Sequence, residues 1–134
     1  MHAVIDTNVL IYDVVEDSKF HESAKELLDN LKRWLIPTIT VYEFVWFFRD
    51  HNFNADETKD FLEQYIHSPK CKVIPDNGEF TSRAFELLEG SSLSRFNDMV
   101  ILAVAERYGA IATFDRKLRS KAKKMNILIL LESL

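Results

Sequence analysis

The sequence predicts an α/β domain with three layers, in which a five-stranded parallel sheet is flanked by helices on both faces. Short runs of apolar and β-branched residues alternate along the 134-residue chain with longer segments of helical periodicity. The strand-like runs are apolar on both faces, which is typical of strands buried within a parallel sheet. Right-handed crossovers between such strands lead to an open sandwich with helices on either side.

The first part of the chain contains two expected strands and a helix between them. HAVID (2–6) is a short buried strand, and Thr7 and Asn8 then begin a turn or a helix. Segment 18–33 has apolar residues spaced by three and four positions, which predicts an amphipathic helix. WLIP (34–37) is the second strand, and its proline closes it.

Two further helices and the third strand are expected in the middle of the chain. Segment 38–52 begins with threonines suited to a helix cap and is apolar nearly all round, so it is buried or lies at an interface. Segment 54–67 is a more polar helix, with a cap at Asn54 or Asp56. KCKVIP (70–75) follows as the third strand.

The last part of the chain repeats the alternation. Helices over 77–90 and 94–109 end at glycines, which readily adopt the left-handed conformation that terminates a helix. The remaining expected elements are the strand AIATF (110–114), the short basic helix RKLRSKAKK (116–124) and the strand NILIL (126–130).

The composition is that of one globular domain spanning residues 1–134. Hydrophobic residues make up 47% of the chain and aromatic residues 12%, which excludes a disordered protein. Cys71 is the only cysteine, so there is no intrachain disulfide, as in a reducing cytosol. The N-terminus lacks the basic lead of a signal peptide, and no apolar run approaches the roughly 20 residues of a membrane span. We therefore expect a cytoplasmic location.

Charge is distributed unevenly along the chain. The net charge of −4 taken alone argues against a nucleic-acid-binding protein. However, the last 40 residues carry eight basic and four acidic side chains, a net charge of +4, which leaves −8 for the first 94. The basic helix over 116–124 is either a solvated helix face or part of a surface that binds nucleic acid.

Four acidic residues from distant segments are expected at one edge of the sheet. Asp6 and Asp115 follow the first and fourth strands. Asp98 opens the helix that leads to the fourth strand, and Glu43 lies near the start of the helix after the second strand. Ligand sites in such sheets lie beyond the carboxyl ends of the strands, so topology alone gathers the four carboxylates. Like charges repel one another unless a cation neutralises them, and oxygen ligands select Mg²⁺ or Mn²⁺ rather than zinc.

Each acid also has a simpler structural explanation. Asp6 suits a turn or a helix cap, and Thr40-x-x-Glu43 fits a capping box. Asp98 and Asp115 stand where a carboxylate stabilises a helix N-terminus electrostatically. These explanations account for the residues singly but not for their convergence.

Three motifs together resemble a known family. VIDTNVLI, TVYEFV and NDMVILAVAERYGAIATFD look like the PIN domain, and more closely the VapC-like ribonuclease toxins of prokaryotic toxin–antitoxin pairs. The resemblance covers essentially the whole chain in order and spacing. It implies a divalent-metal-dependent endoribonuclease with Mg²⁺ or Mn²⁺ as cofactor, RNA as substrate and a cognate antitoxin as protein partner.

The resemblance also implies roles for individual residues. The catalytic and metal-binding acids of the family map onto Asp6, Glu43, Asp98 and Asp115. Its supporting polar residues map onto Thr7 or Asn8 and Thr113. Many members carry one further acid shortly after the final motif, whereas Lys117, Leu118 and Arg119 stand here. The candidates for contacts to RNA phosphates are Arg95, Arg116, Lys117 and Arg119.

Other functions compete with this interpretation. A haloacid-dehalogenase-type phosphatase needs a second aspartate two residues after the first, where Asn8 stands. A response-regulator receiver needs an early acidic pair, and VIDTN has a single acid. The remaining alternatives are a PIN-like domain that binds RNA or protein with little nuclease activity, and an RNA-processing PIN nuclease outside a toxin–antitoxin pair. The intact acidic set favours a nuclease.

The aromatic segment YEFVWFFRDHNF indicates self-association. Successive helical residues step about 100° around the axis, so a helix covered on one side cannot bury Trp46, Phe47 and Phe48 together. Either the following helix covers the remaining side chains or a second subunit does. We expect a homodimer that uses this pair of helices. The resemblance implies the same, because members of that family commonly form homodimers.

Overall fold

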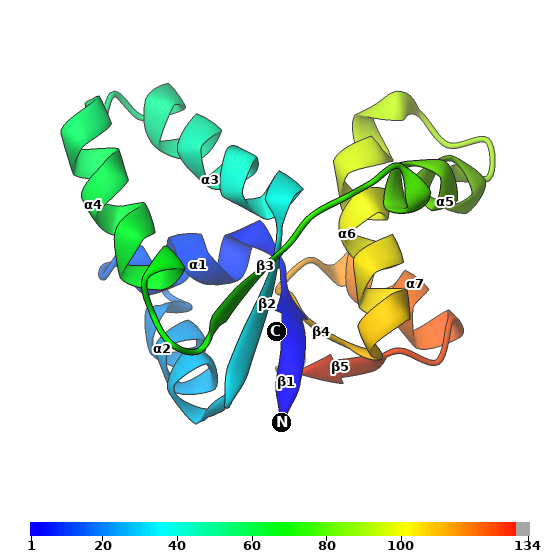
Figure 1. The fold of residues 1–134 in the computed structure, drawn as a ribbon, viewed down its shortest axis with the longest axis horizontal. Coiled ribbons are helices and arrows are strands. Elements are labelled where there is room, and N and C mark those ends of the chain that lie inside the picture. The colour runs from blue at the N-terminus through cyan, green and yellow to red at the C-terminus, as the bar shows by residue number, and fades with distance from the viewer. Residues whose placement is uncertain (131–134) are drawn as a thin grey trace.

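The computed structural model describes residues 1–130, and these form one five-stranded sheet between two layers of helices (Figure 1). All strand pairs are parallel, and their order is β3-β2-β1-β4-β5. The predicted fold class is therefore confirmed. The strands are β1 (His2–Ile5), β2 (Arg33–Pro37), β3 (Cys71–Ile74), β4 (Ala110–Ala112) and β5 (Leu128–Leu130). The helices are α1 (Thr7–Val14), α2 (His21–Asn30), α3 (Thr38–Asp50), α4 (Ala55–Ile66), α5 (Glu79–Leu88), α6 (Phe96–Tyr108) and α7 (Arg116–Lys124), with a 3₁₀ turn, η1 (Leu93–Arg95), before α6.

The two helical layers enclose separate hydrophobic cores. Helices α1 to α4 cover the left face of the sheet in Figure 1, and α5 to α7 cover the right face. Phe44, Phe48 and Tyr65 are fully or almost fully buried in the left core. In the right core α6 runs apolar from Met99 to Ala105, and all seven of these residues are buried. Burial on every side explains why this helix lacks a polar face.

The N-terminus of α3 is joined to the sheet by two threonine hydroxyls. We predicted that these threonines cap the helix, and that is wrong: Pro37 occupies the N-cap position and makes no side-chain capping bond. The Thr38 hydroxyl donates to the carbonyl oxygen of Ile74 at 3.2 Å, and the Thr40 hydroxyl donates to that of Ile5 at 3.1 Å. The two hydroxyls thus bond strand carbonyls near the sheet edge, and neither accepts a backbone N–H at the start of α3.

Other helix ends agree with the sequence. Asn54 forms a complete capping box with Glu57 at the start of α4. Gly109 ends α6 with φ of +91°, a conformation that costs other residues about 1 kcal/mol or more. The left-handed turn at Gly109 lets the chain enter β4 immediately, so the residues after β4 have a fixed position.

The chain changes direction within the sheet at β1. From β1 it proceeds outward to β2 and β3, and it then crosses back to place β4 on the other side of β1. The carboxyl ends of β1 and β4 therefore form a topological switch point, which is where open α/β sheets bind ligands. The Asp6 amide donates to the Ala112 carbonyl at 3.0 Å, so the segments leaving the two strands lie side by side. No helix within residues 1–130 is long and apolar enough to cross a membrane.

Candidate active site

Asp6 is the buried centre of the site. It is only 5% exposed and occupies the N-cap position of α1. One carboxylate oxygen, Oδ1, accepts the Thr7 backbone N–H at 2.8 Å, and Oδ2 accepts the Thr113 hydroxyl at 2.6 Å. Asp6 is thus both a helix cap and a fixed point between β1 and the segment after β4.

Glu43 extends from the second turn of α3 toward two other helices. Its Oε1 accepts the Thr7 hydroxyl at 2.5 Å, and its Oε2 accepts the Asn97 amide at 3.2 Å. The capping-box explanation is wrong, because Thr40 lies buried inside the helix and donates to β1 instead. Glu43 therefore connects α1, α3 and α6 at the sheet edge.

Asp98 and Asp115 form the more open part of the site. Asp98 lies in the first turn of α6, with its Oδ2 3.5 Å from Nη2 of Arg95. Asp115 is the N-cap of α7 and accepts the Leu118 N–H through Oδ1 at 2.9 Å. Its own N–H donates to the Thr113 hydroxyl at 3.0 Å, which links Asp115 to Asp6 through one threonine. The proposed helix-terminal roles of these acids are real, and they coexist with the cluster.

The electrostatics of the site agree with a cluster of four acids. The pKa of Asp6 is raised to about 7, chiefly by burial and further by the charges of Asp98 and Glu43, against the opposing hydrogen bonds from Thr113 and Thr7. Burial also raises the pKa of Asp98, and the neighbouring charges of Asp115 and Glu43 add to the effect. The structure thus gathers the four predicted acids, and their mutual repulsion favours a cation.

The side chains as they stand do not form a closed metal site. Across residues 1–130 no group of three or more His, Cys, Asp or Glu side chains is arranged to hold a metal ion. Glu43 and Asp115 accept hydrogen bonds from protein groups, and Asp98 is paired with Arg95. The donor set still fits a hard divalent ion, because all four groups offer oxygen and two are destabilised as neighbouring anions.

The supporting polar residues fall into two groups. Thr7 and Thr113 donate to the acids as expected from their positions. Among the described residues the hydrogen bond of the Asn8 side chain is to the backbone and not to an acid: its oxygen accepts the Phe114 N–H at 3.3 Å and supports the segment after β4. Asn97, which the sequence did not single out, donates to Glu43. Only its position next to Asp98 could have indicated this role.

The basic candidates also differ in their surroundings. Arg95 is paired with Asp98, so it lies at the border of the acidic cluster. Nη1 of Arg119 donates to the carbonyl oxygens of Thr113 at 2.9 Å and Leu130 at 3.4 Å, which gives Arg119 a structural role. Arg116 and Lys117 lie exposed at the start of α7.

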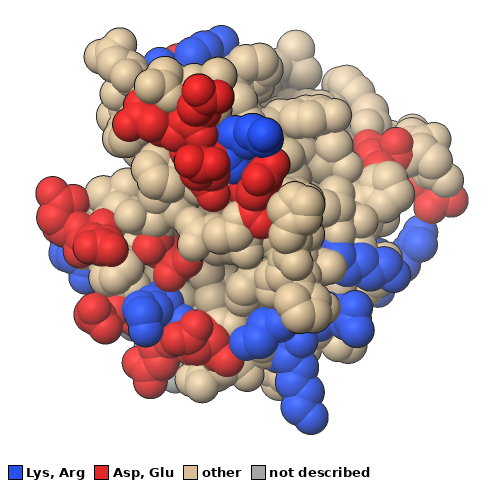
Figure 2. Space-filling view, turned by 60° about the vertical axis from the view of Figure 1, so that its left-hand side comes forward, with Lys and Arg blue, Asp and Glu red and all other residues tan. Residues whose placement is uncertain are grey.

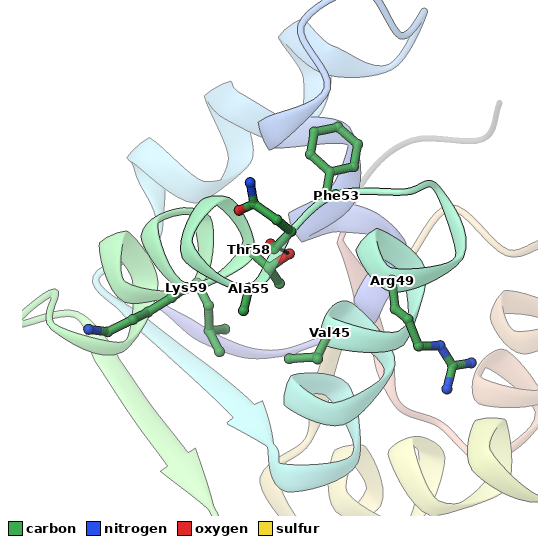
Figure 3. Close-up of a pocket in the computed structure, with 8 residues that line it drawn as sticks. Val45, Arg49, Phe53, Ala55, Thr58 and Lys59 are labelled. Carbon is green, nitrogen blue, oxygen red and sulfur yellow. Dashed lines mark hydrogen bonds between the residues drawn. The ribbon is translucent and has the colours of Figure 1, made fainter.

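A separate apolar pocket of about 420 Å³ lies between α3 and α4 (Figure 3). In Figure 3, Val45 faces Ala55 and Thr58 across this pocket, whereas the head groups of Arg49 and Lys59 point away from it. None of the four clustered acids lines it, so it is not part of the candidate active site. Its lining residues are Val45, Arg49, Phe53, Asn54, Ala55, Thr58, Lys59 and Leu62.

The chain is thus an α/β domain of three layers whose acids lie beyond the carboxyl ends of β1 and β4. This sheet edge is its candidate cation-binding site. Residues 3–124 match the sequence model of the PIN domain. The chain therefore belongs to the PIN-domain family, as its motifs predicted. No curated protein matches the chain significantly in sequence.

Solved structures of distant proteins share the fold. VapC20 of Mycobacterium tuberculosis, a toxin that cleaves the sarcin-ricin loop, superposes with a TM-score of 0.74 at 15% identity, over 88% of this chain and 93% of that one. FitAcB of Neisseria gonorrhoeae gives 0.66 at 19% identity, with coverage of 98% and 97%. VapBC2 of Rickettsia felis, bound to a DNA fragment from its promoter, gives 0.64 at 19% identity, with coverage of 96% and 97%.

Proposed function

We propose that this protein is a divalent-metal-dependent endoribonuclease that hydrolyses RNA phosphodiester bonds, and that it is the toxin of a toxin–antitoxin pair. The observation that carries the chemistry is the buried carboxylate of Asp6, held beside Glu43 and Asp98 with its pKa raised to about 7. A protein maintains such repulsion where a cation offsets it, and perturbed acids cluster at functional sites. Membership of the PIN-domain family supports the assignment.

Each acid has a proposed role in hydrolysis. Asp6, Asp98 and Asp115 hold Mg²⁺ or Mn²⁺, and Glu43 is a further ligand or orients the attacking water. A bound divalent ion supplies a water of lowered pKa and neutralises charge that develops on the scissile phosphate. The Thr113 hydroxyl keeps the Asp6 carboxylate in place, and Thr7 and Asn97 do the same for Glu43.

The proposed substrate and protein partner follow from the structural neighbours. The VapC20 toxin cleaves the sarcin-ricin loop, which supports RNA as the substrate class here. VapBC2 and FitAB are toxin–antitoxin complexes, each solved with a bound DNA fragment. Their likeness to this chain supports a cognate antitoxin as its partner. The apolar pocket between α3 and α4 is a candidate site for one apolar side chain of that antitoxin, because it lies apart from the acids.

We also propose a homodimer, on the basis of the exposed part of α3. Phe48 packs against Phe53, which lies just before α4, and against Phe61 on α4, so the following segment covers that ring. Tyr42 and Trp46 remain 54% and 50% exposed. Two large aromatic side chains one turn apart on an exposed helix face suit a two-fold interface. Sedimentation equilibrium at micromolar concentration tests this, and a monomer throughout would reject it.

The test of the enzymatic proposal is RNA cleavage by the purified chain. Structured and single-stranded RNA are incubated with protein in Mn²⁺, in Mg²⁺ or in EDTA, and Asp6→Asn serves as the inactive variant. Cleavage is expected with a divalent ion only, and the preferred ion identifies the cofactor. Cleavage that persists in EDTA or in Asp6→Asn contradicts the mechanism. RNA binding without cleavage by the wild-type protein would favour the alternative of a binding domain.

A further inference from the structure

Helix α7 presents a stripe of lysines to solvent next to the candidate active site. Leu118 and Ala122 anchor the helix in the right-hand core. Lys117, Lys121 and Lys124 are spaced by four and three residues, so they share one face of the helix. Within the part of the chain that the structure describes, the only ion pair of this stripe joins Nζ of Lys121 to Glu89 Oε2 at 3.7 Å. The stripe thus keeps a net positive charge.

Two adjoining hollows lie along this stripe, and together we name them the basic groove. The hollow nearer the acids has a volume of about 300 Å³, and the other about 450 Å³. They share Leu87, Lys117 and Lys121. The first is completed by Ser91, Arg95 and Met99, and the second by Arg83, Glu89, Ser120, Lys124 and Met125. Lysines therefore line the groove together with the apolar side chains of Leu87, Met99 and Met125, and among the described residues Glu89 is the one acid in the two linings.

Arg95 connects the basic groove to the acidic cluster. It lines the nearer hollow, and its Nη2 is 3.5 Å from Oδ2 of Asp98. A polyanion that leaves the acids past Arg95 therefore meets Lys117 and Lys121 next, and then Lys124. This order of charges gives the groove a direction away from the proposed scissile bond.

The side of the molecule formed by α1 to α4 is more acidic. Figure 2 brings forward the left-hand side of Figure 1, where acidic side chains gather in several patches with a smaller number of basic side chains among them. Residues 1–94, which include α1 to α4 and also α5, carry a net charge of −8. A nucleic-acid backbone is attracted to the side of α7 and repelled from these patches.

We infer that the basic groove binds the sugar–phosphate backbone of the RNA on one side of the scissile bond. This inference rests on the proposed ribonuclease function and extends it to the positioning of substrate. Lys117 and Lys124 contact phosphates, Lys121 exchanges its pairing with Glu89 for the RNA, and Arg95 exchanges Asp98 for the phosphate nearest the acids. The apolar lining residues contact the riboses. Because these contacts touch no base edge, the groove positions RNA without reading its sequence.

The decisive experiment measures RNA affinity without cleavage. Binding of a labelled single-stranded RNA to the full chain is titrated in EDTA at several salt concentrations, for wild type and for Lys117→Gln, Lys124→Gln and Lys123→Gln. The control is matched closely: Lys123 is exposed on the same helix and loses the same charge, but it lines neither hollow. All three positions are exposed, so the variants are expected to fold.

Lys117→Gln and Lys124→Gln are each expected to weaken binding of every RNA sequence tested and to reduce the slope of log affinity against log salt by about 0.7, the value for one phosphate contact on a single strand. Lys123→Gln should change neither quantity appreciably. Equal effects of all three variants would overturn the groove in favour of a diffuse field. No effect of any variant would show that the stripe is a solvated helix face.

The groove and the proposed chemistry can fail separately. If wild type binds RNA through Lys117 and Lys124 but does not cleave it with Mn²⁺, the groove stands and the ribonuclease proposal fails. If wild type cleaves RNA but the lysine variants bind it like wild type, the groove is overturned and the ribonuclease proposal stands.

Discussion

The two ends of the acidic cluster differ in how firmly the protein holds them. Asp6 is enclosed, and each of its oxygens accepts a hydrogen bond from a buried threonine. Asp98 has a side chain 29% exposed, and its counter-charge is the similarly exposed Arg95. At the buried end, the Asp6 carboxylate is held in a place where repulsion from the neighbouring acids is costly. At the open end, the Asp98 carboxylate is free to change its partner. Such a division suits a site that must hold an ion rigidly and still admit a large substrate.

The largest expected effect is on RNA cleavage, and it distinguishes the clustered acids from ordinary surface carboxylates. Asp6→Asn and Asp98→Asn should each reduce RNA cleavage by on the order of 100-fold or more, the scale seen when a charge-stabilising group is removed. Asp60→Asn, an exposed acid on α4, is the control and should retain full activity. Initial rates with saturating Mn²⁺ measure this. Retained activity in Asp6→Asn would remove the buried end from the chemistry.

The stability of the metal-free protein should depend on pH through the buried end. The pKa of Asp6 is about 7 in the folded protein and 3.8 in the unfolded chain, so the folded state binds more protons between these values. The stability contributed by protonated Asp6 is complete below about pH 4 and is lost as pH rises through 7. Each unit of pKa difference corresponds to about 1.4 kcal/mol.

Urea unfolding in EDTA at a series of pH values measures this dependence. Wild type should lose stability by a few kcal/mol from pH 4 to pH 8, a figure that follows from the pKa difference and is an upper bound. Asp6→Asn should flatten the curve and be more stable than wild type at pH 8. Asp98 acts in the same direction but less strongly, since it is partly exposed. Parallel curves for wild type and Asp6→Asn would contradict the raised pKa.

The contrast between the two ends also separates what the sequence predicts from what it does not. Strand ends and helix starts follow from periodicity, so the sequence located Asp6, Glu43, Asp98 and Asp115 at one edge. Hydrogen bonds across the fold depend on where side chains meet after packing. The Asn97 amide reaches Glu43 across 54 positions of sequence, and no local pattern encodes that distance.

The error at the start of α3 has the same origin. A threonine before an apolar helix is a sound local signal for a cap. Two strand carbonyls near the N-terminus of α3 provide acceptors for Thr38 and Thr40 that a sequence cannot reveal. The basic residues of α7 are likewise visible in the sequence. The hydrogen bond from Arg119 to the Thr113 carbonyl is not.

Thr113→Val should produce a smaller effect that tests how the buried end is held. The hydroxyl donates to Asp6 and accepts from the Asp115 N–H, so its removal leaves both partners unsatisfied. We expect a loss of about 1–3 kcal/mol in unfolding free energy at pH 8, and a smaller loss at pH 5, where protonated Asp6 needs the donor less. Thr58→Val is the control, because its hydroxyl bonds a carbonyl at the start of its own helix. Equal losses at both pH values would mean that Thr113 supports packing rather than the Asp6 charge.

The smallest expected effect separates the two roles of Asp115 at the open end. Asparagine caps a helix about as well as aspartate, so Asp115→Asn keeps the bond from Leu118 and removes a charge that repels Asp98. Its metal-free stability should therefore equal or slightly exceed that of wild type, whereas Asp115→Ala should lose about 1 kcal/mol with the cap. Both variants should lose part of the stabilisation by Mn²⁺, since a ligand that binds only the folded state stabilises it by linkage. Thermal melts with and without Mn²⁺ distinguish the cases: an unchanged Mn²⁺ shift in Asp115→Asn would leave Asp115 as a helix cap alone and would confine the metal site to the other three acids.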